Sequence, residues 1–294
     1  MISIVIPTYN RASVLLKTLP SYFAQENVDE IIIVDDDSTD SISEHIDRLQ
    51  SQTQMDIRYI KHPHHKGAAS ARLTGIREAR NQYIVFGEDD VIFDKGYVST
   101  IYNDMIETDA DIIAGRIIHL SENESYENAI LRYNNLNKQL IDYNRLLGEF
   151  GLNVPKPTAV PFVHACFLAR KDVYSKIKYD TNYPGNGFRE ETDPQILALK
   201  EGKKIIFTPN AYCYHLPRSL IRTGGQRLVS NLEFAYWTTR NNIYFLKKHH
   251  AVLAQKYNLR PLWMMIIGAI YFSATNLCFI TVKQIIGKIF KQNT

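Results

Sequence analysis

The stretch Glu30-Ile-Ile-Ile-Val-Asp-Asp-Asp37 places three aspartates directly after a run of branched apolar residues. The stretch Tyr83-Ile-Val-Phe-Gly-Glu-Asp-Asp90 repeats the pattern, with a glycine before three carboxylates. Apolar runs of this length, bounded by turn residues, are typical of buried strands. If both strands belong to one parallel sheet, their carboxylates lie at the same edge of it.

Strand-like and helix-like segments alternate around these two stretches. Ile2–Ile6, Ile57–Ile60 and Ile112–Ile118 are further apolar runs, and helical spacing occupies residues 12–25 and 68–79 between them. The alternation predicts an α/β fold with a mostly parallel central sheet and helices on both faces. Ligands of such sheets bind at the carboxyl ends of the strands.

Beyond residue 120 the pattern is less regular. Glu124–Glu149 is polar and has helical spacing, and three prolines follow it. Glu190–Glu201 predicts another helix, and Leu228–His249 predicts a long one that carries aromatic residues.

Composition excludes several classes of protein. The chain has 294 residues, of which 45% are hydrophobic and 22% charged, so a disordered, collagen-like or disulfide-scaffold protein is excluded. Residues 1–233 carry 26 basic and 31 acidic groups, whereas residues 234–294 carry 8 basic groups and no acidic one. An acidic body gives no support to a nucleic-acid partner. The cysteines are widely spaced, which indicates a reducing compartment; they are Cys166, Cys213 and Cys278.

The cationic tail, residues 251–294, has the pattern of a membrane-associated segment. Leu262–Val282 is 21 residues without a charge, long enough for a helix across the hydrocarbon core. Lys283–Lys291 then has apolar residues at helical spacing among three lysines, as in an interfacial helix. We expect a C-terminal membrane-associated helix, which spans the membrane or lies in its interface, at the cytoplasmic face of the cell membrane. The alternative is a terminal helix buried in the core.

The two acidic clusters, Asp35–Asp37 and Glu88–Asp90, predict a metal–nucleotide site. Crowded carboxylates repel one another unless a cation lies between them, and a divalent ion held by one or two carboxylates and substrate phosphates supplies that charge. The alternative is that the acids are turn residues and helix caps. The sequence contains no Gly-x-Gly-x-x-Gly after its first strand and no Gly-x-x-x-x-Gly-Lys-Ser/Thr. Arg72, on the helix after Gly67, is therefore expected to contact the phosphates together with the metal.

The loop Lys61–Lys66 contains three histidines, His62, His64 and His65, which suggest a zinc site. It contains Pro63 and lacks a cysteine. These residues favour an exposed loop that lines the ligand cleft.

Five short motifs follow one another along residues 2–250. They are Ile4-Val-Ile-Pro-Thr-Tyr-Asn-Arg11, Val34-Asp-Asp-Asp-Ser-Thr-Asp40, Lys66-Gly-Ala-Ala-Ser-Ala-Arg72, Gly87-Glu-Asp-Asp90 and Phe188-Arg-Glu-Glu-Thr-Asp193. Their order and spacing resemble the successive signatures of family 2 glycosyltransferases. The resemblance implies a GT-A fold, a nucleotide-diphosphate sugar donor and a divalent cation, Mg²⁺ or Mn²⁺. It also implies a catalytic domain over residues 1–250, with a nucleotide-binding half (1–120) and an acceptor half (121–250), followed by the tail.

The resemblance assigns the nucleotide to residues of the first half. Thr8 and Asp36 would contact the base region, Asp89 would belong to the same nucleotide site, and Glu88 would lie near the ribose. Glu88 stands where an aspartate is more common in the family. We expect its role to survive, because the change in reach is about one methylene.

The resemblance also assigns the metal and the catalytic base. Asp90 would bind the metal that bridges the diphosphate, and His215 matches a histidine near the diphosphate or the metal. Glu191, preceded by Glu190, takes the place of the base. The alternatives are a helix N-terminus that favours negative charge for the two glutamates, and an ordinary partly buried histidine for His215.

These roles predict a metal-dependent inverting glycosyltransferase that moves a single sugar to a glycan or lipid-linked acceptor. Inverting transfer needs a base for the acceptor hydroxyl and an acid or metal for the leaving diphosphate. The Gln-x-x-Arg-Trp signature of processive synthases is missing, which favours single addition. One alternative is a catalytically inactive, membrane-tethered nucleotide-sugar-binding module. Another is a sugar nucleotidyltransferase, although Pro7-Thr-Tyr-Asn-Arg11 replaces the glycine-rich loop expected there.

Overall fold

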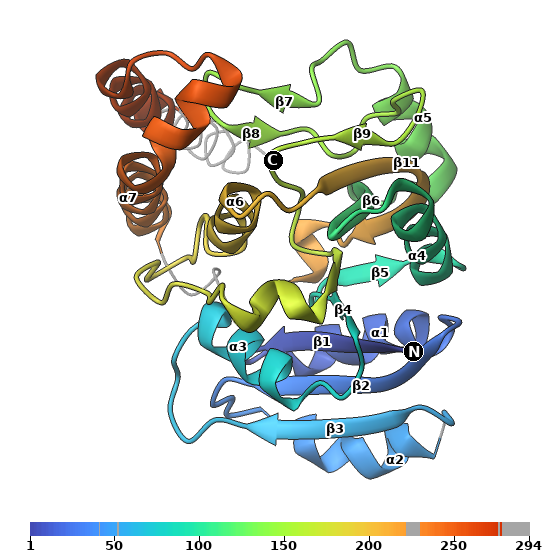
Figure 1. Ribbon diagram of the computed structural model, residues 1–294. Helices are drawn as coiled ribbons and strands as arrows, with labels where there is room; N and C mark the ends of the chain where they lie inside the picture. Colours follow the sequence, from blue (N-terminus) through green and yellow to red (C-terminus); the bar gives the residue numbers. More distant parts are fainter. Residues whose placement is uncertain (41, 52, 222–229, 276, 278–294) are drawn as a thin grey trace, which may run out of the picture.

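The computed structural model describes residues 1–294 except 41, 52, 222–229, 276 and 278–294. A large sheet runs through the molecule in the order β3-β2-β1-β4-β10-β6-β11-β5, with β9 paired to β11 (Figure 1). Its strands are β1 (Ile2–Thr8), β2 (Val28–Asp35), β3 (Asp56–Lys61), β4 (Tyr83–Phe86), β5 (Val91–Phe93), β6 (Ile112–His119), β9 (Thr158–Ala159), β10 (Leu168–Arg170) and β11 (Ile205–His215). A separate hairpin pairs β7 (Ile141–Asp142) with β8 (Leu147–Gly148).

Helices lie on both sides of this sheet, as Figure 1 shows. They are α1 (Ala12–Phe23), α2 (Ile46–Gln50), α3 (Ala68–Glu78), α4 (Tyr97–Thr108), α5 (Tyr126–Asn134), α6 (Thr192–Lys200) and α7 (Asn231–Tyr257). Short 3₁₀ helices are η1 (Ile42–His45), η2 (Lys171–Ser175) and η3 (Arg218–Leu220). Residues 262–275 form a further helix.

The first half of the sheet is parallel, as the sequence predicts. β1 pairs with β2 and β4, and β2 with β3, all in parallel. β1 is buried along almost its whole length, which explains its continuous apolar run. Helix α3 packs closely on it at Gly75, where a Cβ atom would lie 2.1 Å from Cγ1 of Val5. A glycine is therefore required for this close approach.

The second half corrects the expectation of a mostly parallel sheet, because the sheet is mixed. β10 lies between β4 and β6 and runs antiparallel to both, and β5 and β9 run antiparallel to β11. Antiparallel neighbours need no crossover helix, so these short strands leave no βαβ rhythm in the sequence. β11 and β6 are parallel, so β11 still ends at the same edge as β1 and β4.

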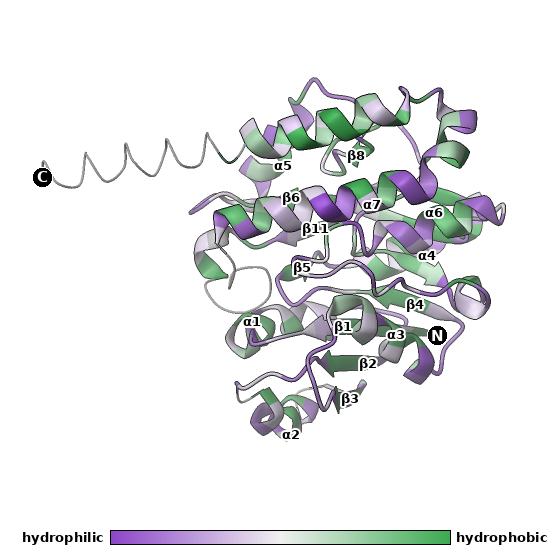
Figure 2. Cartoon of the chain, turned by 90° about the vertical axis from the view of Figure 1, so that its left-hand side faces the viewer, coloured by the Kyte–Doolittle hydropathy of each residue, from purple (hydrophilic) through white to green (hydrophobic). Residues whose placement is uncertain are grey.

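Helix predictions for the second half have mixed outcomes. The helix predicted over Glu124–Glu149 is wrong, because α5 ends at Asn134 and residues 141–148 contain the β7–β8 hairpin. The helix predicted over Glu190–Glu201 is confirmed as α6, and the long aromatic helix is confirmed as α7, which continues to Tyr257. α7 lies across the side of the molecule where the parallel strands end (Figure 2).

The predicted membrane-associated tail is described only in part. The helix at 262–275 buries Met265, which is 4% exposed, while its other face leaves Trp263 63% and Tyr271 70% exposed. A helix enclosed in the core would not expose these side chains. Within the described ranges, no helix is long and apolar enough to cross a membrane. The interfacial helix predicted over Lys283–Lys291 lies outside the described residues.

Candidate active site

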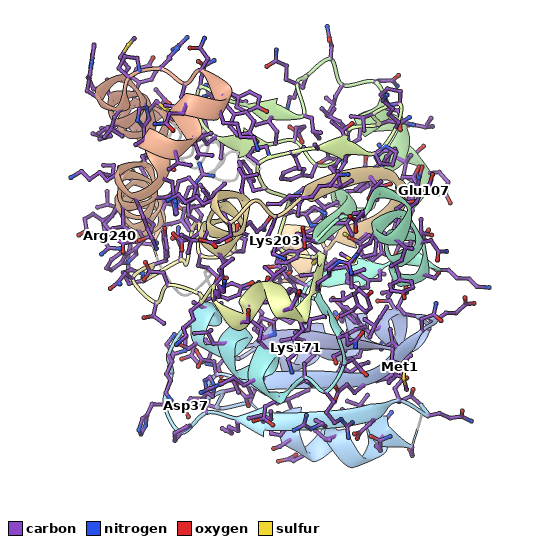
Figure 3. All side chains as sticks on the ribbon, in the orientation of Figure 1. Met1, Asp37, Glu107, Lys171, Lys203 and Arg240 are labelled. Atoms are coloured by element: carbon purple, nitrogen blue, oxygen red, sulfur yellow. The ribbon has the colours of Figure 1, made fainter. Side chains whose placement is uncertain are left out.

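The predicted site residues meet at one edge of the sheet. Thr8 and Asp35 end β1 and β2 and are paired in register, and His215 ends β11. Gly87–Asp90 follows β4 directly. In Figure 3, Asp37 after β2 lies on the same side of the molecule as Arg240 of α7.

Helix α1 holds the acidic turn after β4. Thr18 donates its hydroxyl proton to the carbonyl of Asp89 at 3.1 Å, and Tyr22 donates to the carbonyl of Glu88 at 2.8 Å. Gly87 has no room for a side chain, because a Cβ atom there would lie 2.8 Å from the Tyr22 ring. The backbone of this acidic turn is thus held against α1.

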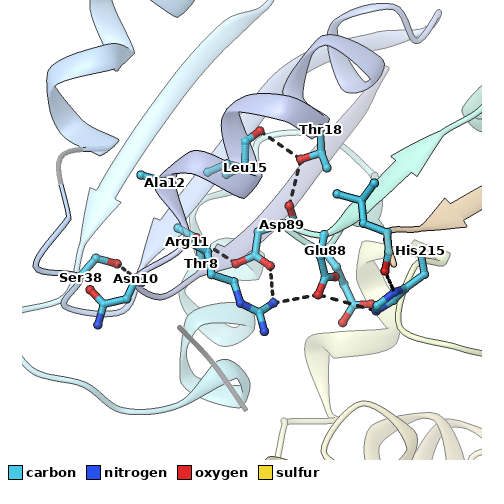
Figure 4. Close-up of polar contacts among 12 residues, drawn as sticks. Thr8, Asn10, Arg11, Ala12, Leu15, Thr18, Ser38, Glu88, Asp89 and His215 are labelled. Carbon is cyan, nitrogen blue, oxygen red and sulfur yellow. Dashed lines mark hydrogen bonds and ion pairs between the residues drawn. The ribbon is translucent and has the colours of Figure 1, made fainter. Parts of the chain in front are cut away.

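Arg11, which the sequence argument missed, joins two of the carboxylates. Its Nη1 lies 2.8 Å from Oδ1 of Asp89 and 2.8 Å from Oδ2 of Asp90. Thr8 donates to the other oxygen of Asp89 at 3.0 Å, so Asp89 contacts two residues of the motif Ile4–Arg11, namely Thr8 and Arg11 (Figure 4). Burial favours the neutral form of Arg11, but Asp89 and Asp90 outweigh it and raise the pKa of the guanidinium. Arg11 therefore acts as the internal counter-charge of the acidic turn.

Asp90 and His215 form the candidate metal centre. Oδ2 of Asp90 lies 3.7 Å from Nε2 of His215, and Nδ1 of His215 lies 2.9 Å from the carbonyl oxygen of Leu216. A carbonyl only accepts, so Nδ1 carries the proton, and in a neutral imidazole the lone pair of Nε2 then faces Asp90.

This donor set fits Mg²⁺ or Mn²⁺. A carboxylate oxygen and an imidazole nitrogen face each other, and the remaining ligand positions of such an ion can be filled by diphosphate oxygens and water. Among the described residues, no group of three or more His, Cys, Asp or Glu side chains is arranged to hold a metal by itself. Asp90 and His215 could therefore hold a metal that takes its remaining ligands from phosphate oxygens and water.

Arg72 lies between two of the predicted site carboxylates. Its Nη1 contacts Oε1 of Glu190, and its Nη2 lies 3.5 Å from Oε1 of Glu88. Burial, with the neighbouring Glu191 and Glu88 carboxylates, raises the pKa of Glu190, and the ion pair with the Arg72 guanidinium opposes that rise. Arg72 was expected to contact phosphates, which stays a prediction, and the structure pairs it with Glu190.

Glu191 is placed differently from Glu190. It stands at the N-cap of α6, and its carboxylate accepts no capping hydrogen bond from the helix. It lies within electrostatic reach of Glu88 and Glu190, because its charge raises the pKa of both. Glu191 therefore makes no capping hydrogen bond, although its place at the N-terminus of α6 still favours a negative charge there.

Comparison with known proteins decides the family. Residues 3–178 match the model described as Glycosyl transferase family 2. The chain belongs to glycosyl transferase family 2. This family 2 glycosyltransferase resembles glycosyltransferase GlyG of Streptococcus pneumoniae serotype 4. The two are 26% identical over 221 residues, and the alignment covers 73% of this chain and 70% of GlyG.

Other relatives differ from it in length. Glycosyltransferase GlyA of the same organism is 34% identical over 277 residues, covering 86% of this chain but 37% of GlyA. The crystal structure of Staphylococcus aureus TarS 1-349 in complex with UDP-GlcNAc superposes with a TM-score of 0.59 at 15% identity, covering 83% of this chain and 66% of that one. The TarS likeness shows the fold, so this glycosyltransferase has a GT-A-like fold with a mixed sheet.

Asp36, expected at the nucleotide base, holds a loop of the protein itself. Its carboxylate accepts the backbone N–H groups of Lys66 at 3.0 Å and Gly67 at 2.6 Å, and it lies 2.7 Å from Nδ1 of His62 and 2.8 Å from Nδ1 of His65. The expectation of an exposed histidine loop is wrong for His62, which is 6% exposed and also contacts the Thr74 hydroxyl. Through these hydrogen bonds Asp36 holds the conformation of the loop before α3, and its predicted contact with the nucleotide stays a prediction.

Proposed function

We propose that this chain is a metal-dependent inverting glycosyltransferase that moves one sugar from a nucleotide-diphosphate donor to a glycan or lipid-linked acceptor. The observation that carries the proposal is the division of the site's acids. Asp90 faces His215 at 3.7 Å, while Glu191 stands apart at the N-cap of α6. Asp90 can therefore help to hold a metal at the donor diphosphate, while a different carboxylate, Glu191, acts as base for the acceptor hydroxyl.

The proposed reaction is a single displacement. The acceptor oxygen attacks the anomeric carbon, the bond from that carbon to the diphosphate oxygen breaks, and Glu191 takes the hydroxyl proton. A bound divalent cation supplies stabilisation of the charge that develops on the leaving diphosphate. Glu190 is unsuited to the base role, because it is paired with Arg72 and 5% exposed.

Uridine diphosphate sugars are the first donors to test. TarS was crystallised with UDP and with UDP-GlcNAc. WfgD of Escherichia coli, 24% identical over 174 residues, is named a UDP-Glc:alpha-D-GlcNAc-diphosphoundecaprenol glucosyltransferase. The WfgD name also supports a lipid-linked acceptor for this chain.

We place this activity at the cytoplasmic face of the cell membrane. The support is the acid-free tail from residue 234 onward and the exposed apolar face of the helix at 262–275. Apolar side chains at an interface and basic residues near anionic lipids both favour binding to such a surface.

The test is donor turnover by the purified full chain with Mn²⁺ and a panel of nucleotide-sugars. We expect sugar transfer with one donor class, and loss of turnover in Asp90→Ala and Glu191→Gln. Asp109→Ala and Glu201→Gln are matched controls, since both residues are exposed and Glu201 lies at the other end of α6. Retained turnover in Asp90→Ala and Glu191→Gln contradicts the mechanism.

Donor binding separates the proposal from its alternatives. A nucleotide-sugar that binds only the folded state raises its stability by RT ln(1 + [L]/Kd). Thermal stabilisation by a donor without transfer or hydrolysis would identify an inactive binding module. Formation of a nucleotide-sugar from a sugar phosphate would identify a nucleotidyltransferase.

A further inference from the structure

One face of α7 holds the loop that carries Glu190 and Glu191. Thr238, Asn242 and His249 recur at the spacing of one helix face. Each contacts a different residue of the segment before or within the first turn of α6. In Figure 2, α7 lies across the side of the molecule where the parallel strands end, and it forms these contacts along its length.

The loop itself has an unusual backbone. Gly185, Gly187 and Arg189 have φ values of +70°, +65° and +78°. Gly185 also has no space for a side chain, because a Cβ atom would lie 2.2 Å from the Trp237 ring of α7. For Arg189, a left-handed conformation costs about 1–2 kcal/mol. Residues held in this way persist only where their surroundings enforce the conformation.

The left-handed conformation of Arg189 is held by hydrogen bonds from its guanidinium to three acceptors. Its Nε donates to Oδ1 of Asn242 at 3.0 Å, its Nη1 donates to the carbonyl of Leu146 at 2.5 Å, and its Nη2 donates to the carbonyl of Arg145 at 3.0 Å. The guanidinium also lies 4.7 Å from the Phe245 ring of α7. The side chain is 2% exposed, so these contacts are made away from solvent.

The first turn of α6 is held by the same helix. Asp193 is fully buried, and its Oδ1 lies 2.6 Å from Nε2 of His249 and 2.7 Å from the hydroxyl of Tyr183. Its Oδ2 accepts from Lys248 at 3.0 Å. Glu190 and Glu191 thus lie between two residues, Arg189 and Asp193, that α7 fixes.

We infer that Asn242 of α7 is a positioning residue for the reaction, which acts through Arg189 to orient Glu191 toward the acceptor hydroxyl. The inference rests on the proposed function. Asn242 bonds Arg189, whereas the acidic turn after β4 is held by α1, so we expect changes at Asn242 to leave donor affinity unchanged. A base displaced by about 1 Å can lose on the order of 100-fold in rate.

The test compares three variants of the full chain. Asn242→Ala removes the acceptor of Arg189 Nε, and Asn242→Asp restores an acceptor oxygen. Thr239→Ala is a control on the same helix, at a hydroxyl that donates to the Ala235 carbonyl within α7. Turnover is measured with donor and Mn²⁺, and UDP affinity with Mn²⁺ by calorimetry. Arg189 is left intact, because removing a buried guanidinium can prevent folding.

The expected result is a split between turnover and affinity. Asn242→Ala lowers kcat about 10- to 100-fold, with the UDP Kd unchanged within about twofold. Asn242→Asp stays within about threefold of wild type, because a charged acceptor keeps the hydrogen bond. Unchanged kcat in Asn242→Ala, or equal losses of kcat and UDP affinity in both Asn242 variants, overturns the inference.

Glu191→Gln, measured alongside, separates this inference from the proposed function. An active Glu191→Gln refutes the base assignment itself. An inactive Glu191→Gln with a fully active Asn242→Ala refutes only the positioning role.

Discussion

Arg72 and Glu190 form a buried ion pair across the active site, between helix α3 and the N-terminal end of α6. Nη1 of Arg72 contacts Oε1 of Glu190, and the two side chains are 3% and 7% exposed. The pair joins α3 to the segment that leads into α6. Because this contact engages Glu190, we propose Glu191 as the base.

Removing one partner of this pair should destabilise the protein strongly. Arg72→Met leaves Glu190 buried without its counter-charge, and such a change costs about 3–5 kcal/mol. Equilibrium urea unfolding of the full chain measures it. Arg77→Met on the same helix, where the arginine is exposed and donates to the Thr74 hydroxyl, should cost less than about 1 kcal/mol. The double variant Arg72→Met/Glu190→Gln should recover part of the loss, and a strictly additive double variant would show that the two side chains do not interact.

Arg11 should compete with the divalent cation for Asp90. Its Nη1 is 2.8 Å from the same Oδ2 atom that faces His215. Arg11→Gln should therefore tighten the binding of Mn²⁺ alone by about 10-fold, as one unit charge is removed from the site. Manganese titration followed by electron paramagnetic resonance measures this without donor or turnover. Lys138→Gln, which removes a surface ion pair with Glu149, is the control. Weaker Mn²⁺ binding in Arg11→Gln would show that Arg11 organises the site instead.

Much of the site was predictable from the sequence because its signal is local. The apolar runs before Asp35 and Glu88 predicted buried strands, and their carboxyl ends do meet at one sheet edge. The predicted division into a nucleotide-binding and an acceptor half stays a prediction. His215 could be assigned only through the family, and the structure places it 3.7 Å from Asp90.

What the sequence could not supply depends on distant contacts. Arg11 is 78 and 79 residues from Asp89 and Asp90, so no spacing rule joins them. Asp36 was expected to face the nucleotide, but the loop residues that surround it come 26 to 31 positions later. β10 is three residues long, and its position in the sheet is set by its antiparallel pairing with β4 and β6. In each case tertiary pairing outweighs the local pattern.

Acid should weaken the anchoring of α7 through Asp180. Burial alone would raise the pKa of Asp180, but hydrogen bonds from Lys248, Asn182 and Tyr244 lower it to about 2. Because the folded state binds this proton less readily than the unfolded chain, the stabilisation is complete above about pH 4 and is lost as the pH falls through about 2. We expect a contribution of about 1–2 kcal/mol after allowance for solvent screening.

Urea unfolding at about pH 5 and about pH 3 measures this contribution. Asp180→Asn should be less stable than wild type at the higher pH, and the difference should shrink at the lower one. Asp109→Asn, at a side chain that is 94% exposed, is the control and should track wild type. A difference that stays constant with pH would mean that Asp180 contributes through packing instead of charge.

The exposed face of the helix at 262–275 should bind anionic membranes. Its outward side chains include Trp263, Ile267 and Tyr271, which are 63%, 57% and 70% exposed. Exchanging these three for serine should abolish co-sedimentation with vesicles of phosphatidylglycerol and phosphatidylcholine, because apolar burial at the interface is lost. Wild-type binding should weaken with added salt, since the neighbouring cations contribute through screened attraction.

A matched triple exchange tests whether the location of the apolar residues matters. Ile106, Tyr126 and Leu131 are 50%, 41% and 56% exposed on α4 and α5, and their exchange for serine should leave vesicle binding intact. Both triple variants should retain stabilisation by UDP with Mn²⁺, which shows that the donor site is still folded. If the variant at 263, 267 and 271 unfolds, that face belongs to the core. If it still binds vesicles as well as wild type, the membrane contact lies elsewhere in the chain, because the three exposed apolar side chains of this face have been removed.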